Sequence, residues 1–332
     1  MKVAVNGFGR IGRDVVRILV QNNDPDLELV AVNIVSDLET NAHLFKYDSI
    51  YGIFDGEVSV NGDELTLGDK KIKVVNDRDP ENLPWEELGV ELVIDSTGAF
   101  RDKEGLSKHI KAGAKKVLLT APGKGVDKTI VLGVNDDDYD PENDVVISNA
   151  SCTTNCLAPV VKVINDNFGI VRGLMTTVHA YTNDQKLHDD AHKDIRRARA
   201  AALSMIPTTT GAAKAVAQVI PEMEGKLTGY AIRVPIPTVS ITDVVFEIEK
   251  EATVEEINAA IKKASENEMK GLLGYSDDKL VSIDFQGDSR SSIFDADLTL
   301  VNGNMIKVAS WYDNEWGYSN RVVDLAKLVA TK

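Results

Sequence analysis

The first dozen residues limit the possible fold more than any other part of the chain. The apolar run Val3–Val5 leads directly into NGFGRIG (6–12), which has the pattern G-x-G-x-x-G, and an amphipathic segment follows. In a strand–turn–helix of this kind, Gly7 permits the tight turn, Gly9 lets the backbone approach a pyrophosphate, and Gly12 lets the helix pack closely on the strand. The three glycines alone also suit an ordinary turn. The strand before them and the helix after them favour dinucleotide binding.

The first half of the chain continues with short apolar runs that alternate with amphipathic segments. Such alternation predicts an α/β fold with a parallel, doubly wound sheet of the Rossmann type. We expect buried strands at Lys2–Asn6, Leu29–Asn33, Leu92–Asp95, Val117–Thr120 and Val145–Ser148. We expect helices between them at Arg10–Gln21 and Asp102–Ala112.

The second half has a different pattern, which predicts an α+β domain with a mainly antiparallel sheet buried on one face. Runs of alternating polarity cover Gly229–Lys250, Lys279–Gln286 and Ser291–Asp313. Thr253 begins a capping box for one helix, and a last helix is expected at about Asn320–Ala330. Because the pattern changes near residue 150, we place a domain boundary there and expect a dinucleotide-binding domain at 1–150.

Composition excludes several classes of protein. The net charge of −15, from 52 acidic and 37 basic residues, disfavours binding to nucleic acid or to an anionic membrane, although a local arginine cluster still permits small anionic substrates. No run of about 18 apolar residues occurs, and the N-terminus lacks an apolar signal region. Two cysteines are too few for a disulfide scaffold and fit a reducing compartment. We expect a soluble, cytoplasmic protein.

Both cysteines lie in one short segment, ASCTTNC (150–156), and allow three interpretations. A disulfide between residues four apart on a helix is strained, and no segment rich in Cys or His completes a metal site, so no metal is expected. The third interpretation is one nucleophile and one bystander. Cys152 falls in the first turn of an expected helix, where unpaired N–H groups and the helix dipole lower a thiol pKa, whereas Cys156 packs one turn further on. A thiolate adds to aldehydes, and the adduct can pass hydride to a nicotinamide.

A base and an anion site are the other elements this chemistry needs. Among five histidines, only His179 follows a strand-like run, Gly173–Val178, and precedes a polar segment. A histidine at a strand end beside hydrogen-bond donors is a candidate base, although a lone histidine is more often a packing or surface residue. Three arginines occur in the four residues 196–199, and Thr208–Gly211 and Arg233 follow. In so acidic a chain, this grouping indicates an oxyanion site.

At these residues the chain resembles phosphorylating glyceraldehyde-3-phosphate dehydrogenases. The segments that carry the resemblance are NGFGRIGR, FKYDS, SNASCTTNC, TTVHAYTNDQ, RRARAA, PTTTGAAKAV, RVPIP and WYDNEWGYS. They occur in one register from the first residues to the last helix. SNASCTTNC and the threonine–glycine loop are highly specific, whereas the glycine fingerprint is not.

The resemblance implies a role for each matching residue. Cys152 is the nucleophile and forms a thioester, and His179 is its base. The site for the attacking inorganic phosphate is formed by Ser151, Thr153, Thr210 and Gly211, and the substrate's own phosphate binds Thr182 and Arg233, with Arg197 serving the phosphate sites. The cofactor contacts fall at Asn6, Gly7, Phe8, Gly9, Arg10, Ile11, Gly12, Asn33, Ile34, Arg78, Thr120 and Asn314, of which Asn314 bonds the nicotinamide carboxamide.

The resemblance also implies an architecture and partners. The catalytic domain spans 151–314, and a C-terminal helix at about 315–332 packs back on the first domain. The substrates are glyceraldehyde 3-phosphate and inorganic phosphate. A homotetramer is implied, in which the loop Tyr181–Leu203 approaches a neighbouring subunit's cofactor.

The sequence departs from the family at the cofactor. A NAD-binding fold usually places an acid after the second strand to bind the ribose, but this chain has Ile34, with Ser36 nearby as a donor to a 2′-phosphate. Ile34 can also simply pack against adenine while another group binds the ribose. Asp190-Ala191 replaces the Leu-Pro of NAD-specific members. Both changes resemble members that accept NADP, although Asp190 is an unfavourable neighbour for a 2′-phosphate. We expect use of both NAD and NADP.

Two other functions remain as alternatives at this point. Erythrose-4-phosphate dehydrogenase shares the cysteine segment, but it generally lacks the AYTNDQ and TTTGAAK segments that this chain has at 180–185 and 208–214. A nucleotide-sensing or RNA-binding relative is the alternative from another class. The intact Cys152 and His179 and the net charge of −15 argue against it.

Overall fold

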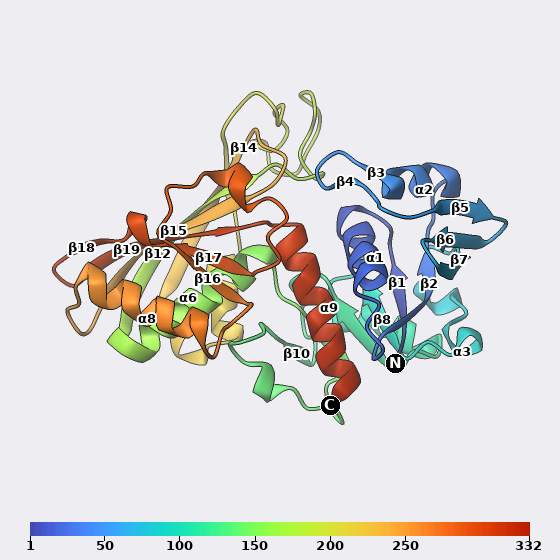
Figure 1. Cartoon of the computed structure of the whole chain (residues 1–332), viewed down its shortest axis with the longest axis horizontal. Coiled ribbons are helices and arrows are strands. Elements are labelled where there is room, and N and C mark those ends of the chain that lie inside the picture. The colour runs from blue at the N-terminus through green and yellow to red at the C-terminus, as the bar shows by residue number, and fades with distance from the viewer. The chain divides into compact units, whose positions relative to one another are not determined.

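The structure, a computed structural model, describes the whole chain from Met1 to Lys332 (Figure 1). The chain divides into two compact units. The first unit contains Met1–Ile130, Asp137–Ala150 and Ser319–Lys332, and the second contains Val131–Asp136 and Ser151–Tyr318. The last helix thus belongs with the N-terminal unit from Ser319 onward.

The first unit is built on a nine-stranded sheet with the order β10-β11-β9-β8-β1-β2-β7-β6-β5. Its strands are β1 (Lys2–Asn6), β2 (Glu28–Asn33), β5 (Val58–Asn61), β6 (Glu64–Leu67), β7 (Lys70–Val75), β8 (Leu92–Asp95), β9 (Lys116–Leu119), β10 (Lys128–Thr129) and β11 (Val146–Ser148). Neighbours are parallel from β10 to β7, and only the β7-β6-β5 edge is antiparallel. The chain runs from β1 to β2 on one side and returns to β8 on the other. This reversal beside β1 is where doubly wound sheets bind their ligands.

The expected α/β class and Rossmann-type sheet are therefore confirmed, and the five expected strands lie within one residue of those observed. The antiparallel edge was not expected. The helices of this unit are α1 (Arg10–Asn22), α2 (Leu38–Lys46), α3 (Trp85–Leu88), α4 (Lys103–Leu106), α5 (Lys108–Lys111) and most of α9 (Trp316–Thr331), and β3 (Tyr47–Asp48) pairs with β4 (Gly52–Ile53). The single helix expected at Asp102–Ala112 was wrong. It is interrupted at Ser107, which separates the four-residue helices α4 and α5 and whose hydroxyl donates to the Lys103 carbonyl at 2.6 Å.

The second unit contains a mixed, mainly antiparallel sheet with the order β13-β14-β12-β15-β19-β17-β16, and β18 pairs with β19. Its strands are β12 (Ile170–Ala180), β13 (Ile206–Thr209), β14 (Leu227–Val234), β15 (Ser240–Ile248), β16 (Leu273–Ser276), β17 (Ser292–Asp295), β18 (Leu300–Asn302) and β19 (Met305–Tyr312). Only β12–β14 and β16–β17 are parallel pairs. Successive residues of β15 alternate strictly between buried and half-buried positions, because one face of the sheet carries the core.

Helices α6 (Cys152–Phe168) and α8 (Val254–Glu266) lie along this sheet in Figure 1, and α7 (Ala212–Ala215) is short. The capping box at Thr253 is confirmed: Thr253 Oγ1 accepts the Glu256 N–H, and the Glu256 carboxylate accepts the Thr253 N–H. The strand expected at Lys279–Gln286 was wrong. Ser282–Phe285 is a 3-10 turn, closed where the Asp284 carboxylate accepts the Val281 N–H at 2.8 Å.

None of the helices combines the length and apolar character needed to cross a membrane. No group of three or more His, Cys, Asp or Glu side chains is placed to hold a metal ion.

Candidate active site

The glycine turn of the first unit has the geometry that a dinucleotide pyrophosphate requires. Gly7 has a φ of +97°, which favours glycine, and a Cβ on Gly12 would lie 2.1 Å from the Gly7 carbonyl oxygen. Gly9, in contrast, is exposed, and a Cβ built on it meets no atom within 4 Å. Gly9 is also the N-cap of α1 and offers no side-chain cap, so the first N–H groups of the helix face open space and suit a phosphate.

A buried polar network lies beneath this turn, at the carboxyl ends of β1, β2 and β8. The Asp95 carboxylate accepts from the Asn6 amide at 2.8 Å and faces Nε2 of His109 at 3.1 Å, and the Trp85 indole N–H donates to His109 Nδ1 at 2.9 Å. Asn33 donates to Oδ1 of Asn6 at 2.7 Å. Asp95 and His109 are fully buried. Because Trp85 supplies a proton to Nδ1, the ring carries its own proton on Nε2, which donates to Asp95.

The network changes how several expected cofactor residues act. Asn6, Phe8, Asn33 and Ile34 are at most 6 % exposed, so they lie beneath the turn and offer little surface to a ligand. Sequence reasoning missed the remaining members, Trp85, Asp95 and His109. The sequence did contain a sign of Asp95, because this acidic residue ends a buried parallel strand and begins the polar segment DSTG (95–98).

The other expected cofactor residues of this unit are more accessible. Arg10 and Ile11 are half-buried at the start of α1, and the Arg10 guanidinium is paired with Asp48 and lies over the Tyr51 ring. Arg78 is exposed, and Thr120 is half-buried after β9. Ser36, beyond the end of β2, is exposed, and its hydroxyl oxygen accepts from the Asn41 amide at 2.8 Å.

The second unit brings the expected nucleophile and base together. Cys152 is the first residue of α6, where Ser151 caps the helix by accepting the Thr154 N–H at 3.0 Å. Cys152 Sγ lies 3.6 Å from Nε2 of His179, near the end of β12. The other ring nitrogen, Nδ1, donates to the Ala180 carbonyl at 2.7 Å. That hydrogen bond leaves the Nε2 lone pair directed at the sulfur, which is the arrangement of a general base.

The charge balance of this pair differs from the sequence expectation. Although part of its side chain is accessible, the sulfur of Cys152 is desolvated, and this burial raises the pKa of the thiol; the Arg233 charge and Thr153 act in the opposite direction. The expectation that the helix start yields a net lowered pKa was therefore wrong. Burial, assisted by the Arg233 charge, lowers the pKa of His179 to about 3. The imidazole is therefore neutral and faces the thiol with its Nε2 lone pair, and the same burial makes it a weaker base than a free imidazole.

Cys156 is the bystander. It is fully buried, lies 3.5 Å from the hydroxyls of Thr242 and Ser292, and burial raises its pKa to about 12. Neither cysteine is in a disulfide.

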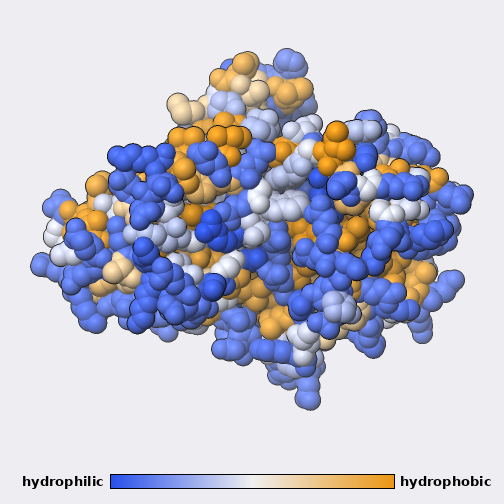
Figure 2. All heavy atoms as spheres, viewed as in Figure 1, coloured by the Kyte–Doolittle hydropathy of each residue, from blue (hydrophilic) through white to orange (hydrophobic).

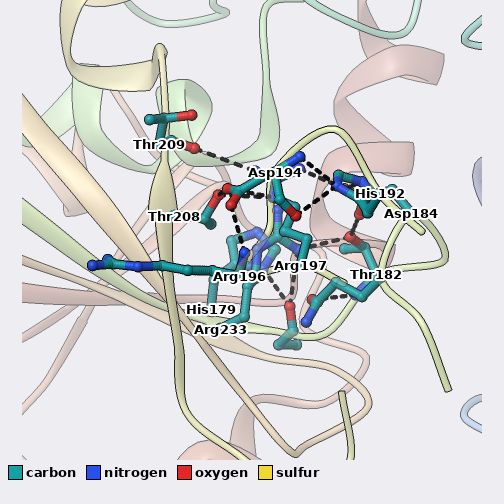
Figure 3. Close-up of polar contacts among 12 residues, drawn as sticks. His179, Thr182, Asp184, His192, Asp194, Arg196, Arg197, Thr208, Thr209 and Arg233 are labelled. Atoms are coloured by element: carbon teal, nitrogen blue, oxygen red, sulfur yellow. Dashed lines mark hydrogen bonds and ion pairs between the residues drawn. The ribbon is translucent and has the colours of Figure 1, made fainter. Parts of the chain in front are cut away.

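Two arginines converge close to His179, as Figure 3 shows. Arg233 donates to the Ala180 carbonyl at 3.1 Å and to the Thr182 hydroxyl at 2.8 Å, and its Nε is buried without a hydrogen-bond partner. Arg197 donates through Nε to Thr208 Oγ1 at 2.8 Å and is paired with Asp184. Arg196 extends away from this group.

Asp184 was not expected in the site. Its carboxylate accepts from Thr182 and from Arg197. Because Thr182 also accepts from Arg233, this carboxylate links the two arginines of the cluster. Burial alone would raise the pKa of Asp184, but the Thr182 hydroxyl and the charges of Arg197 and Arg233 outweigh burial and lower it. The DQ pair at 184–185 gave no reason to separate this carboxylate from a solvated loop residue.

The residues expected to hold inorganic phosphate lie around the start of α6 and α7, but not all of them face the open side. Thr154 Oγ1 donates to the Ala212 carbonyl at 3.5 Å, which links the two helix starts, and Thr210 Oγ1 accepts the Ala212 N–H at 3.2 Å. Gly211 is exposed. Thr153 is only 4 % exposed, and its hydroxyl pairs with Tyr312 at 2.8 Å, so that side chain supports the site from inside.

A Rossmann-type unit with an open glycine turn, together with a unit that holds a thiol, its base and an arginine cluster, defines a dinucleotide-dependent dehydrogenase with a cysteine nucleophile. Comparison with known proteins identifies the family. The model described as the glyceraldehyde 3-phosphate dehydrogenase NAD binding domain matches residues 1–103, and the C-terminal domain model of the same family matches residues 151–314. The chain belongs to the glyceraldehyde-3-phosphate dehydrogenase family.

Relatives cover the full length of the chain. It is 61 % identical over 333 residues to glyceraldehyde-3-phosphate dehydrogenase of Geobacillus stearothermophilus, which covers 100 % of this chain and 99 % of the relative. It is 58 % identical over 334 residues to glyceraldehyde-3-phosphate dehydrogenase 2 of Trichormus variabilis and 57 % identical over 334 residues to the enzyme of Streptomyces coelicolor, with the same coverage. None of these relatives is named for erythrose 4-phosphate, so that alternative is not favoured.

Proposed function

We propose that this chain oxidises glyceraldehyde 3-phosphate in the presence of inorganic phosphate and NAD or NADP, through a thioester on Cys152. The observation that carries the proposal is the placement of Cys152 Sγ 3.6 Å from a neutral His179 whose Nδ1 is held by a backbone carbonyl. A thiol with a raised pKa needs such a base at the moment of attack, because the sulfur becomes nucleophilic only as its proton leaves.

The residues of the second unit account for the proton and charge movements. As Cys152 Sγ attacks the aldehyde carbon, Nε2 of His179 accepts the thiol proton, and the resulting imidazolium together with the Cys152 N–H stabilises the oxyanion. A bound nicotinamide would supply the hydride acceptor. Inorganic phosphate then attacks the thioester carbon, the C–S bond breaks, and Cys152 is released with an acyl phosphate as product.

We assign the phosphate groups of the reactants to the arginine cluster. Arg233 Nε is buried without a partner, and Thr182 and Arg233 already bond each other, so these two residues suit the phosphate of the substrate. Ser151, Thr210 and Gly211 are assigned to inorganic phosphate, Thr153 supports them from inside through its hydroxyl bond to Tyr312, and Arg197 serves both phosphate groups. Asp184 is the internal anion that a bound phosphate must compete with.

We further propose that the enzyme uses both NAD and NADP. Ile34 places no carboxylate at the end of β2, so nothing at that position repels a 2′-phosphate, and the exposed Ser36 can donate to it. The charge of Asp190, the unfavourable residue, is offset by Lys186 at 3.2 Å. Initial rates with each dinucleotide test this proposal. A preference for NAD of about 100-fold in kcat/KM, which equals about 2.7 kcal/mol, would contradict it.

A matched pair of measurements tests the role of Ser36. The Ser36→Ala variant is expected to lose about five- to tenfold in kcat/KM with NADP, because one hydrogen bond to the 2′-phosphate is absent. The same variant with NAD is its own control and should stay within about twofold of the unaltered enzyme. An equal loss with both dinucleotides would assign Ser36 a structural role instead.

We also propose that the active form is a homotetramer. Leu187, Ile195, Leu203 and Met205 are each more than 70 % exposed, and hydrophobic atoms gather on this loop region at the top of the view in Figure 2. Exposed apolar groups in such number are typical of a surface that another subunit covers. Light scattering coupled to size exclusion tests the mass of the assembly. The cytoplasmic location stays a prediction from the reduced cysteines.

The reaction itself is tested by an assay with and without inorganic phosphate. Without phosphate, the enzyme is expected to release one equivalent of reduced dinucleotide per active site and then stall, because the thioester has no acceptor. Cys152→Ser should lose at least about 10³-fold in kcat, whereas Cys156→Ser, which alters the buried bystander, should retain turnover. Steady turnover without phosphate would contradict the phosphorylating reaction.

A further inference from the structure

Val239 adopts a backbone conformation that a β-branched residue rarely takes. Its φ is +67°, and it is one of only three residues other than glycine with a positive φ. Such a conformation is energetically unfavourable for a β-branched residue, and it persists only where the surrounding packing enforces it. Here the side chain is 1 % exposed and packs in a cluster with Phe285 and Ile293. The core cluster holds Val239 in this unfavourable conformation, which indicates that the conformation serves the function of the protein.

The two residues that flank Val239 each make a side-chain hydrogen bond to the segment that follows β19. Thr238 Oγ1 donates to Asp313 Oδ1 at 2.9 Å, and Ser240 Oγ donates to Asn314 Oδ1 at 3.0 Å. Thr238 and Ser240 therefore hold the side chains of two consecutive residues, Asp313 and Asn314. Val239 directly precedes Ser240, the first residue of β15, so its positive φ lies at the entry to this strand, between the two hydroxyls.

Ser240 makes a second hydrogen bond that leads to the base. Its Oγ accepts the Ala180 N–H at 3.1 Å, and the carbonyl of the same residue accepts from Nδ1 of His179 at 2.7 Å. The Ser240 side chain is 1 % exposed, so both bonds are shielded from water. One hydroxyl thus links the residue that orients His179 to the amide of Asn314.

We propose that Ser240 is a positioning residue for hydride transfer, which rests on the proposed function of the site. By donating to Oδ1 of Asn314, it fixes the orientation of that amide and leaves Nδ2 as an N–H donor for the carboxamide oxygen of a nicotinamide. By accepting from Ala180, it holds the peptide that fixes the ring of His179. The strained Val239 is the device that places Ser240 against both partners.

The test compares loss of this hydroxyl with loss of another buried hydroxyl on the same strand. Ser240→Ala is expected to weaken binding of NAD to the apoenzyme about tenfold by calorimetry, and to lower kcat/KM for NAD by at least as much, with KM for glyceraldehyde 3-phosphate within twofold. Thr242→Val is the matched control, because Thr242 is 2 % exposed and contacts Cys156 and the Ser310 carbonyl instead. Urea unfolding of both variants verifies that each is folded.

A double-mutant cycle separates positioning from general damage. If Ser240 acts through Asn314, the variant Ser240→Ala/Asn314→Ala should bind NAD no more weakly than Asn314→Ala alone. Additive losses, or a Ser240→Ala variant that binds NAD like Thr242→Val, would overturn the proposal. Because calorimetry needs no turnover, these results remain distinct from failure of the proposed function, which would appear as unaltered enzyme that binds NAD but does not oxidise glyceraldehyde 3-phosphate.

Discussion

The indole N–H of Trp85 donates to Nδ1 of His109 at 2.9 Å, and the opposite ring nitrogen faces the Asp95 carboxylate at 3.1 Å. The His109 ring is thus held between a donor and an acceptor in the interior of the first unit. Asp95 also accepts the backbone N–H and hydroxyl of Thr97, at 3.1 and 2.8 Å. The glycine turn is therefore supported by a buried carboxylate whose hydrogen bonds come from three segments of the chain.

Replacement of His109 by leucine tests the energetic importance of this arrangement. His109→Leu leaves the Trp85 N–H without an acceptor and removes one donor from Asp95, so we expect a loss of about 2–4 kcal/mol in the free energy of unfolding. Urea denaturation measures it. Trp85→Phe removes the matching donor, and the double variant should lose less than the sum of the two single losses. Strict additivity would show that the two rings contribute independently.

The glycines of the turn predict two distinct outcomes. Gly12→Ala places a Cβ 2.1 Å from the Gly7 carbonyl oxygen, so we expect it to destabilise the fold by several kcal/mol and to shift the urea midpoint. Gly9→Ala meets no atom within 4 Å and should unfold like the unaltered protein. It should nevertheless bind NAD at least about tenfold more weakly, because the methyl group stands where the pyrophosphate approaches. Normal NAD affinity in Gly9→Ala would place the pyrophosphate elsewhere.

The features predicted correctly from the sequence are those that depend on neighbouring residues. The strand–turn–helix at Gly7–Gly12 and the capping box at Thr253 need only short-range patterns, and both are confirmed. The proximity of Cys152 and His179 was expected from the chemistry and the resemblance together. Their 3.6 Å separation is a property of the fold, because 27 positions separate the two residues.

The features that were missed depend on contacts between distant segments. The bonds from Ser240 to Ala180 and Asn314 join residues 60 and 74 positions apart, and no local pattern announces them. The thiol pKa was misjudged for a related reason: the helix start is a local property, whereas the desolvation that outweighs it comes from the whole site. The expected strand at Lys279–Gln286 failed because a single side chain, Asp284, closes a turn within an alternating sequence.

Removal of the Arg233 charge should shift the reactivity of Cys152 in a defined direction. A positive charge favours the thiolate and so lowers the pKa of Cys152, although burial keeps that pKa raised overall. In Arg233→Gln the opposing charge is absent, so the pKa rises further. The rate of alkylation by iodoacetamide should therefore increase at higher pH than in the unaltered enzyme.

Cys152→Ser provides the blank for this measurement, since Cys156 is fully buried and should not react in the folded protein. A Cys152 profile that is unchanged or moves to lower pH in Arg233→Gln would show that Arg233 does not act on the thiol.

Asp184 should contribute to stability above its ordinary pKa of 3.8 and lose that contribution in acid. Its folded-state pKa is lowered, because hydrogen bonding from Thr182 and the charges of Arg197 and Arg233 outweigh burial. A group with a depressed folded-state pKa stabilises the fold above its unfolded-state value, and the contribution disappears as the pH falls through the folded-state value. Asp184→Asn lacks this titration. Its urea midpoint should therefore fall less than that of the unaltered protein between about pH 5 and about pH 3, an interval that brackets the ordinary pKa of an aspartate.

Asp190→Asn is the matched control for that measurement. The pKa of Asp190 is also lowered, first by a backbone hydrogen bond and then by Lys186, but its side chain is 68 % exposed and its pairing is screened by water. Its acid profile should therefore follow that of the unaltered protein closely. If Asp184→Asn and Asp190→Asn changed the profile equally, the bridge from Asp184 to Thr182 and Arg197 would be no stronger than an ordinary surface contact, and a phosphate would meet no competing anion in the arginine cluster.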